Sequence, residues 1–452
     1  MAKEKSIARS MTEGKPLGLL LRFALPLMLG NIFQQMYVVV DTAIVGQLGV
    51  TALASVGAAD WLHWLFTGIA QGFTQGFGVL MAIKFGEKDT DGLNDALSAS
   101  ALLSAILAAV LLLLGQTTLP WILRIMDTPG DVYPGARLYI GTLFWGLPFS
   151  VAFNYSASVL RALGDSKTPL KAMTVASLTN IALDILFVFG FKWGIAGAAV
   201  ATVIAQGISA AICFCGMRRI SFLRFRGILL KGFGALYAKL MRLGVPVAFQ
   251  NVIIAVGGLI VQATANGFGT LFIAGFTATN KLYCLLEIAA VSLGHAISTY
   301  VGQNFGARKF LRLRTGVRTG AWVALGISVL ISAVMLTFGR FFSQIFITGT
   351  PEEILSATDT AVAYLRAMSL YLPVLYMLYV YRSALQGMGD TTIPMVSGIV
   401  EFVCRVGIVK TMPQVFGPHA VFYAEVAAWA GAAILLVAAY YIEIRRVPKS
   451  DA

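Results

Sequence analysis

The sequence predicts an all-α membrane protein with twelve transmembrane helices in two similar lobes of six helices each. Composition is the first reason: 58% of the 452 residues are hydrophobic and only 12% are charged, against about 25% charged in an ordinary soluble domain. An internal repeat is the second, because Pro26 and Asn31 recur in the second half as Pro246 and Asn251, at one constant offset. A chain this apolar cannot hide its surface in a water-soluble core, so a lipid bilayer is its expected partner.

The repeat continues through the later part of each half at a slightly larger offset. The segment Leu163–Asp165 recurs as Met388–Asp390, and Tyr139 recurs as Tyr364 at the same offset. An offset that holds over many helices and changes at one loop indicates two pseudo-symmetric halves. Six spans per half is an even number, so both halves are expected to insert with the same orientation, as parallel repeats do.

Twelve apolar stretches are long enough to cross a bilayer, for which a helix needs about 20 residues. They lie at residues 17–44, 52–82, 94–116, 134–160, 168–190, 195–217, 237–265, 271–302, 315–338, 356–386, 392–412 and 418–443. The predicted organisation is an N-lobe at residues 1–217, a basic cytoplasmic linker at 218–236 and a C-lobe at 237–452.

Lysines and arginines collect in the loops on one side of these spans. The N-terminus, the linker and the loop with Arg308, Arg312 and Arg314 are strongly basic, whereas the opposite loops carry few basic residues. The positive-inside rule then places both termini in the cytoplasm. Topology and anionic lipid headgroups account for the net charge of +13, so no nucleic-acid partner is expected. We expect a multi-pass monomer in the cytoplasmic (inner) membrane.

Acidic residues inside the spans indicate a structural or functional role, because placing a carboxylate at the bilayer centre costs roughly 2.5–3.5 kcal/mol of insertion free energy. The candidates are Asp41, Asp60, Asp184, Glu287, Glu401 and Glu425. No specific role is predicted for Glu425.

Four polar residues of the first half could form a cation site. Asn180 precedes Asp184 by one helical turn and shares its face, Asp41 follows an apolar run, and Thr202 offers a hydroxyl. Hard cations prefer several oxygen ligands of which at least one is charged, so these residues could bind Na⁺ if their helices are neighbours. Two close carboxylates could also carry a proton. The alternative is that local hydrogen bonds satisfy each residue separately.

The second half does not repeat this set of residues. At the offset that relates Tyr139 to Tyr364, Asn180 aligns with Arg405 and Asp184 with Val409. Glu401 and Arg405 are one turn apart on one helix, a spacing that suits an internal salt bridge with a structural or gating role.

Three further residues are candidates for substrate binding or for gating. Asp60 lies among tryptophans and could attract an organic cation through charge and cation–π interactions, although tryptophans also anchor helix ends at the membrane interface. Glu287 could face a cavity and attract a cationic substrate. Pro26 and its repeat Pro246 could kink the first helix of each half, either as a static bend or as a moving one.

Several motifs together carry a resemblance to a known family. They are Pro26 with Asn31, Val40–Gly46, Leu160–Asp165 with Pro169, Asn180 with Asp184, Gly194–Thr202 and Val301–Ala307. On these motifs the chain resembles the prokaryotic branch of the multidrug and toxic compound extrusion (MATE) family over nearly its whole length.

The resemblance implies a V-shaped antiporter that exports organic cations, drugs or metabolites in exchange for Na⁺ or H⁺. It implies that Asp41, Asn180, Asp184 and Thr202, with Tyr139 nearby, form the N-lobe cation site, at which Na⁺ is the possible metal. The coupling ion is the only expected companion, and no cofactor is expected. Some branches place coupling acids on the seventh and tenth helices, where this chain has no deep acid.

Two other functional classes fit the sequence less well. A flippase of polyprenyl-linked sugars would need a wide basic cavity for pyrophosphate, whereas the deep charges here are mostly acidic. An enzyme would need a catalytic cluster, and the sequence contains no His-Glu-x-x-His motif, nucleophile elbow or glycine-rich phosphate loop.

Overall fold

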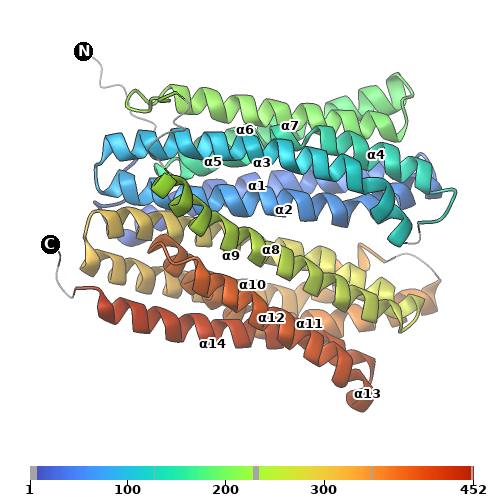
Figure 1. The fold of residues 1–452 in the computed structure, drawn as a ribbon. Coiled ribbons are helices and arrows are strands. Elements are labelled where there is room, and N and C mark those ends of the chain that lie inside the picture. Colours follow the sequence, from blue (N-terminus) through green and yellow to red (C-terminus); the bar gives the residue numbers. More distant parts are fainter. Residues whose placement is uncertain (1–7, 127, 228–233, 348–349, 449–450, 452) are drawn as a thin grey trace. The chain divides into compact units, whose positions relative to one another are not determined.

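The computed structural model describes residues 8–126, 128–227, 234–347, 350–448 and 451, without the side chains of residues 50 and 58–61. These residues form helices and their connections, with no strand among them, which confirms the all-α fold class. Figure 1 shows the long helices of each half running beside one another.

Eight helical elements make up the first half of the chain. They are α1 (Pro16–Gly46), α2 (Val50–Gly86), α3 (Thr90–Ile125), α4 (Tyr133–Trp145), α5 (Leu147–Ala162), α6 (Lys167–Asp184), the π-helix η1 (Ile185–Gly190) and α7 (Ile195–Arg218). The contacts among them are local: α6 packs against α7, and α2 and α7 both pack against α5 and α4.

Eight elements make up the second half. They are α8 (Gly234–Asn266), α9 (Thr270–Gly306), α10 (Phe310–Gln344), α11 (Pro351–Gly387), α12 (Thr392–Thr411), α13 (Pro413–Phe416), the 3₁₀ helix η2 (Pro418–Phe422) and α14 (Tyr423–Arg446). Here α11 packs against α9, α10 and α14, and α12 packs against α14.

The described chain shows ten or eleven candidate membrane spans, against the twelve predicted. Ten helices of the described chain are long and apolar enough to cross a membrane, and the bent pair α4–α5 makes eleven. The remaining long helix, α2, has 37 residues, more than the roughly 20 that a span needs. It covers the predicted span 52–82 but is not among the helices apolar enough to be counted.

The fourth span is broken in the first half and continuous in the second. In the first half, α4 and α5 meet at Gly146 with a bend of 43°, and Pro148 follows in the first turn of α5. In the second half, α11 continues through the equivalent Pro373, because Tyr371 stands where the first half has Gly146. Glycine and proline together therefore break the span, whereas proline alone leaves it whole.

Contacts divide the chain into two compact units whose borders fall inside helices. One unit contains Met1–Ser10 and Leu25–Ala248, and the other contains Met11–Ala24 and Phe249–Ala452. The division of α1 falls directly before Pro26, and the division of α8 falls shortly after Pro246. Each proline thus lies where the first helix of its half passes from one unit to the other.

The described residues after α7, up to residue 227, run along α3 without forming a helix. The side chain of Asn94 donates to the carbonyl of Phe222 at 3.1 Å and accepts from the backbone N–H of Arg224 at 2.9 Å. Arg226 forms ion pairs with Asp91 and Asp95. This start of the linker is therefore tied to the first half.

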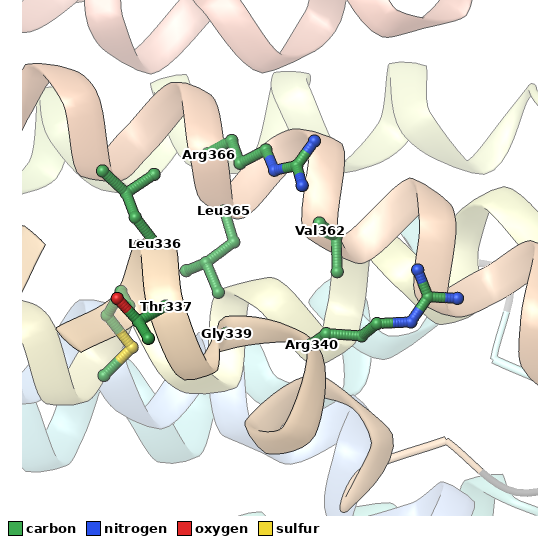
Figure 2. A pocket seen from close by; sticks show the side chains of 8 residues that line it. Leu336, Thr337, Gly339, Arg340, Val362, Leu365 and Arg366 are labelled. Atoms are coloured by element: carbon green, nitrogen blue, oxygen red, sulfur yellow. The ribbon is translucent and has the colours of Figure 1, made fainter. Parts of the chain in front are cut away.

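A pocket of about 220 Å³ lies between α10 and α11. Figure 2 shows it lined by apolar side chains of both helices and by Arg340 and Arg366.

Close packing between α2 and the beginning of α8 depends on glycine. A Cβ atom placed on Gly76 would lie 2.5 Å from the carbonyl oxygen of Leu243 and 2.6 Å from the Cα of Gly244. Backbone atoms cannot move aside as a flexible side chain can, so these glycines permit a backbone-to-backbone approach.

We predict that Gly76→Ala lowers the stability of the protein by roughly 1–3 kcal/mol, because the added methyl group overpacks this contact. The matched control is Gly57→Ala on the same helix, where a Cβ meets no atom within 4 Å and alanine favours the helix. Thermal unfolding in detergent compares the two. Equal unfolding temperatures for both variants would contradict the packing role.

Candidate functional site

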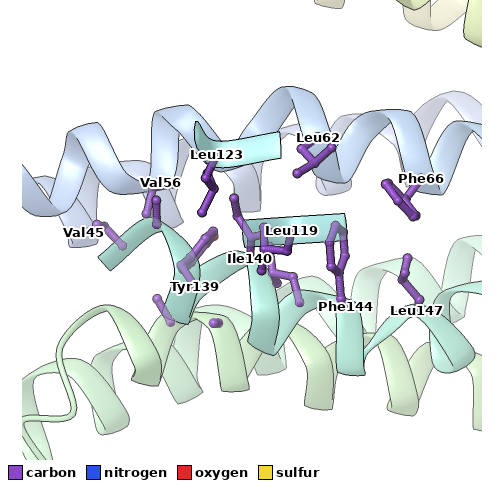
Figure 3. Close-up of a cluster of buried hydrophobic side chains, with 14 of the residues drawn as sticks. Val45, Val56, Leu62, Phe66, Leu119, Leu123, Tyr139, Ile140, Phe144 and Leu147 are labelled. Atoms are coloured by element: carbon purple, nitrogen blue, oxygen red, sulfur yellow. The ribbon is translucent and has the colours of Figure 1, made fainter. Parts of the chain in front are cut away.

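Tyr139 connects the apolar core of the first half to the carboxylate of Asp41. Its ring is buried in α4, in a cluster that includes Val45, Val56 and Ile140, as Figure 3 shows. Its hydroxyl donates a hydrogen bond of 3.3 Å to Asp41 Oδ2. Val45 belongs to the same cluster and follows Asp41 by one turn of α1. The apolar core therefore holds both Tyr139 and Asp41 in position.

Asn180 and Thr202 lie opposite each other on α6 and α7. The amide Nδ2 of Asn180 donates to Thr202 Oγ1 at 3.4 Å, and both side chains are buried. The donor of Asn180 is thereby used, which leaves its carbonyl oxygen as a free acceptor.

Asp184 is the last residue of α6 and is fully buried, with 0% exposure. It lies close enough to Asp41 for the two carboxylates to interact electrostatically. The structure therefore brings together the predicted residues of α1, α4, α6 and α7. Hydrogen bonds join Tyr139 to Asp41 and Asn180 to Thr202, and Asp41 and Asp184 interact electrostatically.

Three acceptor oxygens of this cluster have no donor among the described residues. Both carboxylate oxygens of Asp184 and Oδ1 of Asn180 are buried and accept no hydrogen bond from the described residues. A buried acceptor without a partner costs about 1–3 kcal/mol, and more if it is charged. Oxygens of this kind, one turn apart on one helix face, fit the ligand preference of a small hard cation or can take up a proton.

The backbone changes its geometry directly after Asp184. Residues Ile185–Gly190 form the π-helix η1, which together with α6 makes up the predicted span 168–190. The N–H of Phe191 bonds to the carbonyl of Leu186 at 2.8 Å, five residues back. A Cβ on Gly197 of α7 would come within 3.0 Å of Phe187, so α7 packs tightly on this segment. Such π-segments often occur at functional sites.

Two polar residues next to the site were not predicted from the sequence. Tyr37 precedes Asp41 by one turn of α1 and interacts electrostatically with Asp41 and Asp184. Gln206 follows Thr202 by one turn of α7, and its Oε1 is buried without a donor in the described chain. Their spacing of one helical turn from Asp41 and from Thr202 is the sequence feature that could have identified them.

A buried ion-pair network occupies the second half. Glu401 on α12 pairs with Arg382 on α11, and with Arg405 at 3.7 Å. Arg405 also donates from Nε and Nη2 to Glu425 Oε2 of α14, at 3.0 and 2.7 Å. All four residues are buried. The predicted pair Glu401–Arg405 is thus part of a larger network, to which Arg382 and Glu425 contribute.

Glu287 lies at one end of this network on α9. The Tyr379 hydroxyl donates to Glu287 Oε1, and the Tyr283 side chain also hydrogen-bonds to the carboxylate. The Arg382 guanidinium lies 5.7 Å from the centre of the Tyr379 ring, which links Glu287 to the other four charges. With three carboxylates and two guanidinium groups, the ionised network has one negative charge in excess.

Pro26 and Asp60 are the two remaining residues predicted for the site. Pro26 lies inside α1, near the division between the two units. Asp60 belongs to α2, and its side chain lies outside the described residues.

We predict that Arg405→Leu destabilises the protein by about 3–5 kcal/mol, because the buried Glu425 loses its counter-charge, whereas Glu401 keeps Arg382. The control Arg446→Leu removes an exposed i,i+3 pair with Glu443 and should cost less than about 1 kcal/mol. Unfolding in denaturant, with helix content as the signal, measures both losses. If the two variants proved equally stable, the network would not support the fold.

A family model matches the chain twice. The MatE model matches residues 26–186 and 246–409. The two matches begin at Pro26 and Pro246, the pair of prolines at which the sequence repeats.

Curated relatives and solved structures agree with this match. The chain is 30% identical over 335 residues to the "Probable multidrug resistance protein YoeA" of Bacillus subtilis, covering 72% of each protein. It is 26% identical to the "Probable multidrug resistance protein YpnP" of the same organism, covering 87% of this chain and 88% of that protein. A solved MOP-superfamily transporter from Pyrococcus furiosus has the same fold, with a TM-score of 0.91, 21% identity and full coverage of both chains.

These matches confirm a multi-pass membrane transporter rather than an enzyme, and they favour efflux over the flippase alternative. The chain belongs to the MatE family of multidrug efflux transporters.

Proposed function

We propose that this protein is a secondary active antiporter that exports organic cations in exchange for Na⁺ or H⁺ by alternating access. The observation that carries the proposal is the buried oxygen cluster in the first half. Asp184 and Asn180 present acceptor oxygens that no described donor satisfies, and Asp41 lies close enough to add its charge. A mobile cation at this point would neutralise the carboxylates. We further propose an inner-membrane monomer with both termini in the cytoplasm.

Exchange requires that each ligand prefers a different state of the protein. A ligand shifts a conformational equilibrium only by its difference in affinity between the two states. In our proposal the cation favours the state in which Asp41 and Asp184 are close, because it cancels the repulsion between them. Substrate favours the other state, so the binding of one ligand promotes release of the other.

In our proposal the two prolines couple cation binding to bending of the helices that contain them. Pro26 and Asp41 share α1, and the division between the contact units falls directly before Pro26. Because proline removes one helical hydrogen bond, it allows a bend at that point. We propose that neutralisation of Asp41 changes the bend at Pro26, and that Pro246 takes the equivalent place in α8.

For the substrate we propose Glu287 as one contact, with Asp60 as a second candidate. Glu287 lies at the end of a network with one excess negative charge, and it is only half-buried. Tyr283 and Tyr379 hold its carboxylate, and the Tyr283 ring stacks on Trp429 at 5.8 Å. A carboxylate beside aromatic rings suits an organic cation.

We predict that Asp41→Asn keeps the fold and lowers gradient-driven efflux of a cationic dye by about tenfold or more, the range of a strong coupling between two sites. Proteoliposomes with an imposed Na⁺ gradient, or an imposed pH gradient, measure this efflux and identify the ion. Asp131→Asn changes an exposed aspartate of the α3–α4 loop and serves as the matched control. Wild-type efflux from Asp41→Asn under both gradients would rule out the proposed site.

We predict that Glu287→Gln raises the KM for a cationic dye by about tenfold, since it removes the charge of a contact worth roughly 1.5–3 kcal/mol. The response to the driving ion should persist, because Asp41 and Asp184 are unchanged. Dye concentration series in the same proteoliposomes provide the measurement, with the exposed Glu352→Gln as control. An unchanged KM would remove Glu287 from the substrate site.

A further inference from the structure

The pocket between α10 and α11 combines an apolar lining with two arginines. Met335, Leu336, Val362 and Leu365 contribute apolar atoms, and Arg340 and Arg366 contribute the charges. In Figure 2, Leu336 and Leu365 lie next to each other, and both arginine side chains extend toward the same side of the view. Gly339 allows the two helices to approach here, because a Cβ at this position would lie 2.6 Å from Leu365 Cδ2.

The position of the pocket along α10 corresponds to the boundary of the hydrocarbon core. The stretch 319–339 between Arg318 and Arg340 contains no charged residue, and its length is that of one membrane crossing. Arg340 therefore lies at the level of the lipid headgroups, at the end of α10 opposite the basic residues around Arg318. Phe338 and Phe341 beside it are 55% and 64% exposed, as expected for side chains that face lipid.

The charges at the pocket do not cancel. Arg340 pairs with Asp359 at 3.2 Å, with more than half of each side chain exposed. Arg366 is exposed, and none of the ion pairs among the described residues includes it. Two guanidinium groups and one carboxylate leave one positive charge, next to an apolar surface at headgroup depth.

We propose that this pocket binds one anionic phospholipid, with the phosphate between Arg340 and Arg366 and an acyl chain along Leu336, Val362 and Leu365. Guanidinium groups match the geometry of a phosphodiester and bind it with charge-assisted hydrogen bonds. One phosphate charge balances the one excess positive charge. The apolar lining assigns the site to a lipid rather than to free phosphate, which would leave that surface uncovered.

The internal repeat supplies a natural comparison. An open pocket also lies between α3 and α4 of the first half, lined by Gln116, Arg137 and Trp145 among others. Gly141 stands there at the position equivalent to Arg366, at the offset that relates Tyr139 to Tyr364. The first-half pocket has a single arginine, so its affinity for an anionic lipid should be weaker.

Native mass spectrometry of the full chain, released from detergent with added lipid, tests the proposal. The probes are palmitoyl-oleoyl phosphatidylglycerol, the zwitterionic palmitoyl-oleoyl phosphatidylethanolamine and inorganic phosphate. We expect wild-type protein to retain phosphatidylglycerol in preference to phosphatidylethanolamine. Arg340→Gln and Arg366→Gln should each weaken retention of phosphatidylglycerol about tenfold, the effect of one charge-assisted contact. The control Arg124→Gln changes an exposed arginine in the last turn of α3 and should retain wild-type binding.

A second variant separates lipid binding from a general loss of structure. Val362→Trp fills the apolar part of the pocket and keeps both arginines, so it should also reduce retention of phosphatidylglycerol. Wild-type retention by the double variant Arg340→Gln/Arg366→Gln, or by Val362→Trp, would overturn the proposal. Displacement of the lipid by millimolar inorganic phosphate would overturn it as well, because it would show that the site recognises the anion alone.

Discussion

The absence of water from the hydrocarbon core is the constraint on which the rest of this structure depends. Backbone groups satisfy it by forming helices, which is why the described chain contains no strand. Charged side chains can satisfy it only with a partner inside the protein or with a mobile ion. The two halves of this chain satisfy it in these two different ways.

The contrast is clearest at one pair of equivalent positions. Asn180 of the first half aligns with Arg405 of the second. In the second half, the Arg405 guanidinium is a covalently attached cation that pairs with Glu401 and Glu425. In the first half, an amide occupies that position, and the oxygens of Asp184 have no donor among the described residues. A duplicated scaffold thus carries a permanent cation in one half and, in our proposal, a place for an exchangeable cation in the other.

Much of this organisation could be predicted from the sequence. The length of an apolar stretch determines where a span begins and ends, so the predicted spans 195–217 and 392–412 agree closely with Ile195–Arg218 and Thr392–Thr411. Asp41 and Asp184 could be selected because charges are rare within apolar runs. The partners of Arg382 and Glu425 could not be predicted, because they depend on which helices pack together. The π-helix after Asp184 depends in the same way on the contact between Gly197 and Phe187.

The central claim is that Asp184 belongs to a binding site for an exchangeable cation, and direct cation binding tests it. The unfolding temperature of purified wild type and Asp184→Asn can be followed while Na⁺ replaces choline at constant ionic strength, and in a second series as pH is lowered. A ligand that binds only the folded protein stabilises it in proportion to RT ln(1 + [L]/Kd). We predict that wild type gains stability relative to Asp184→Asn in at least one of these series. A constant difference between the two proteins in both series would contradict the account.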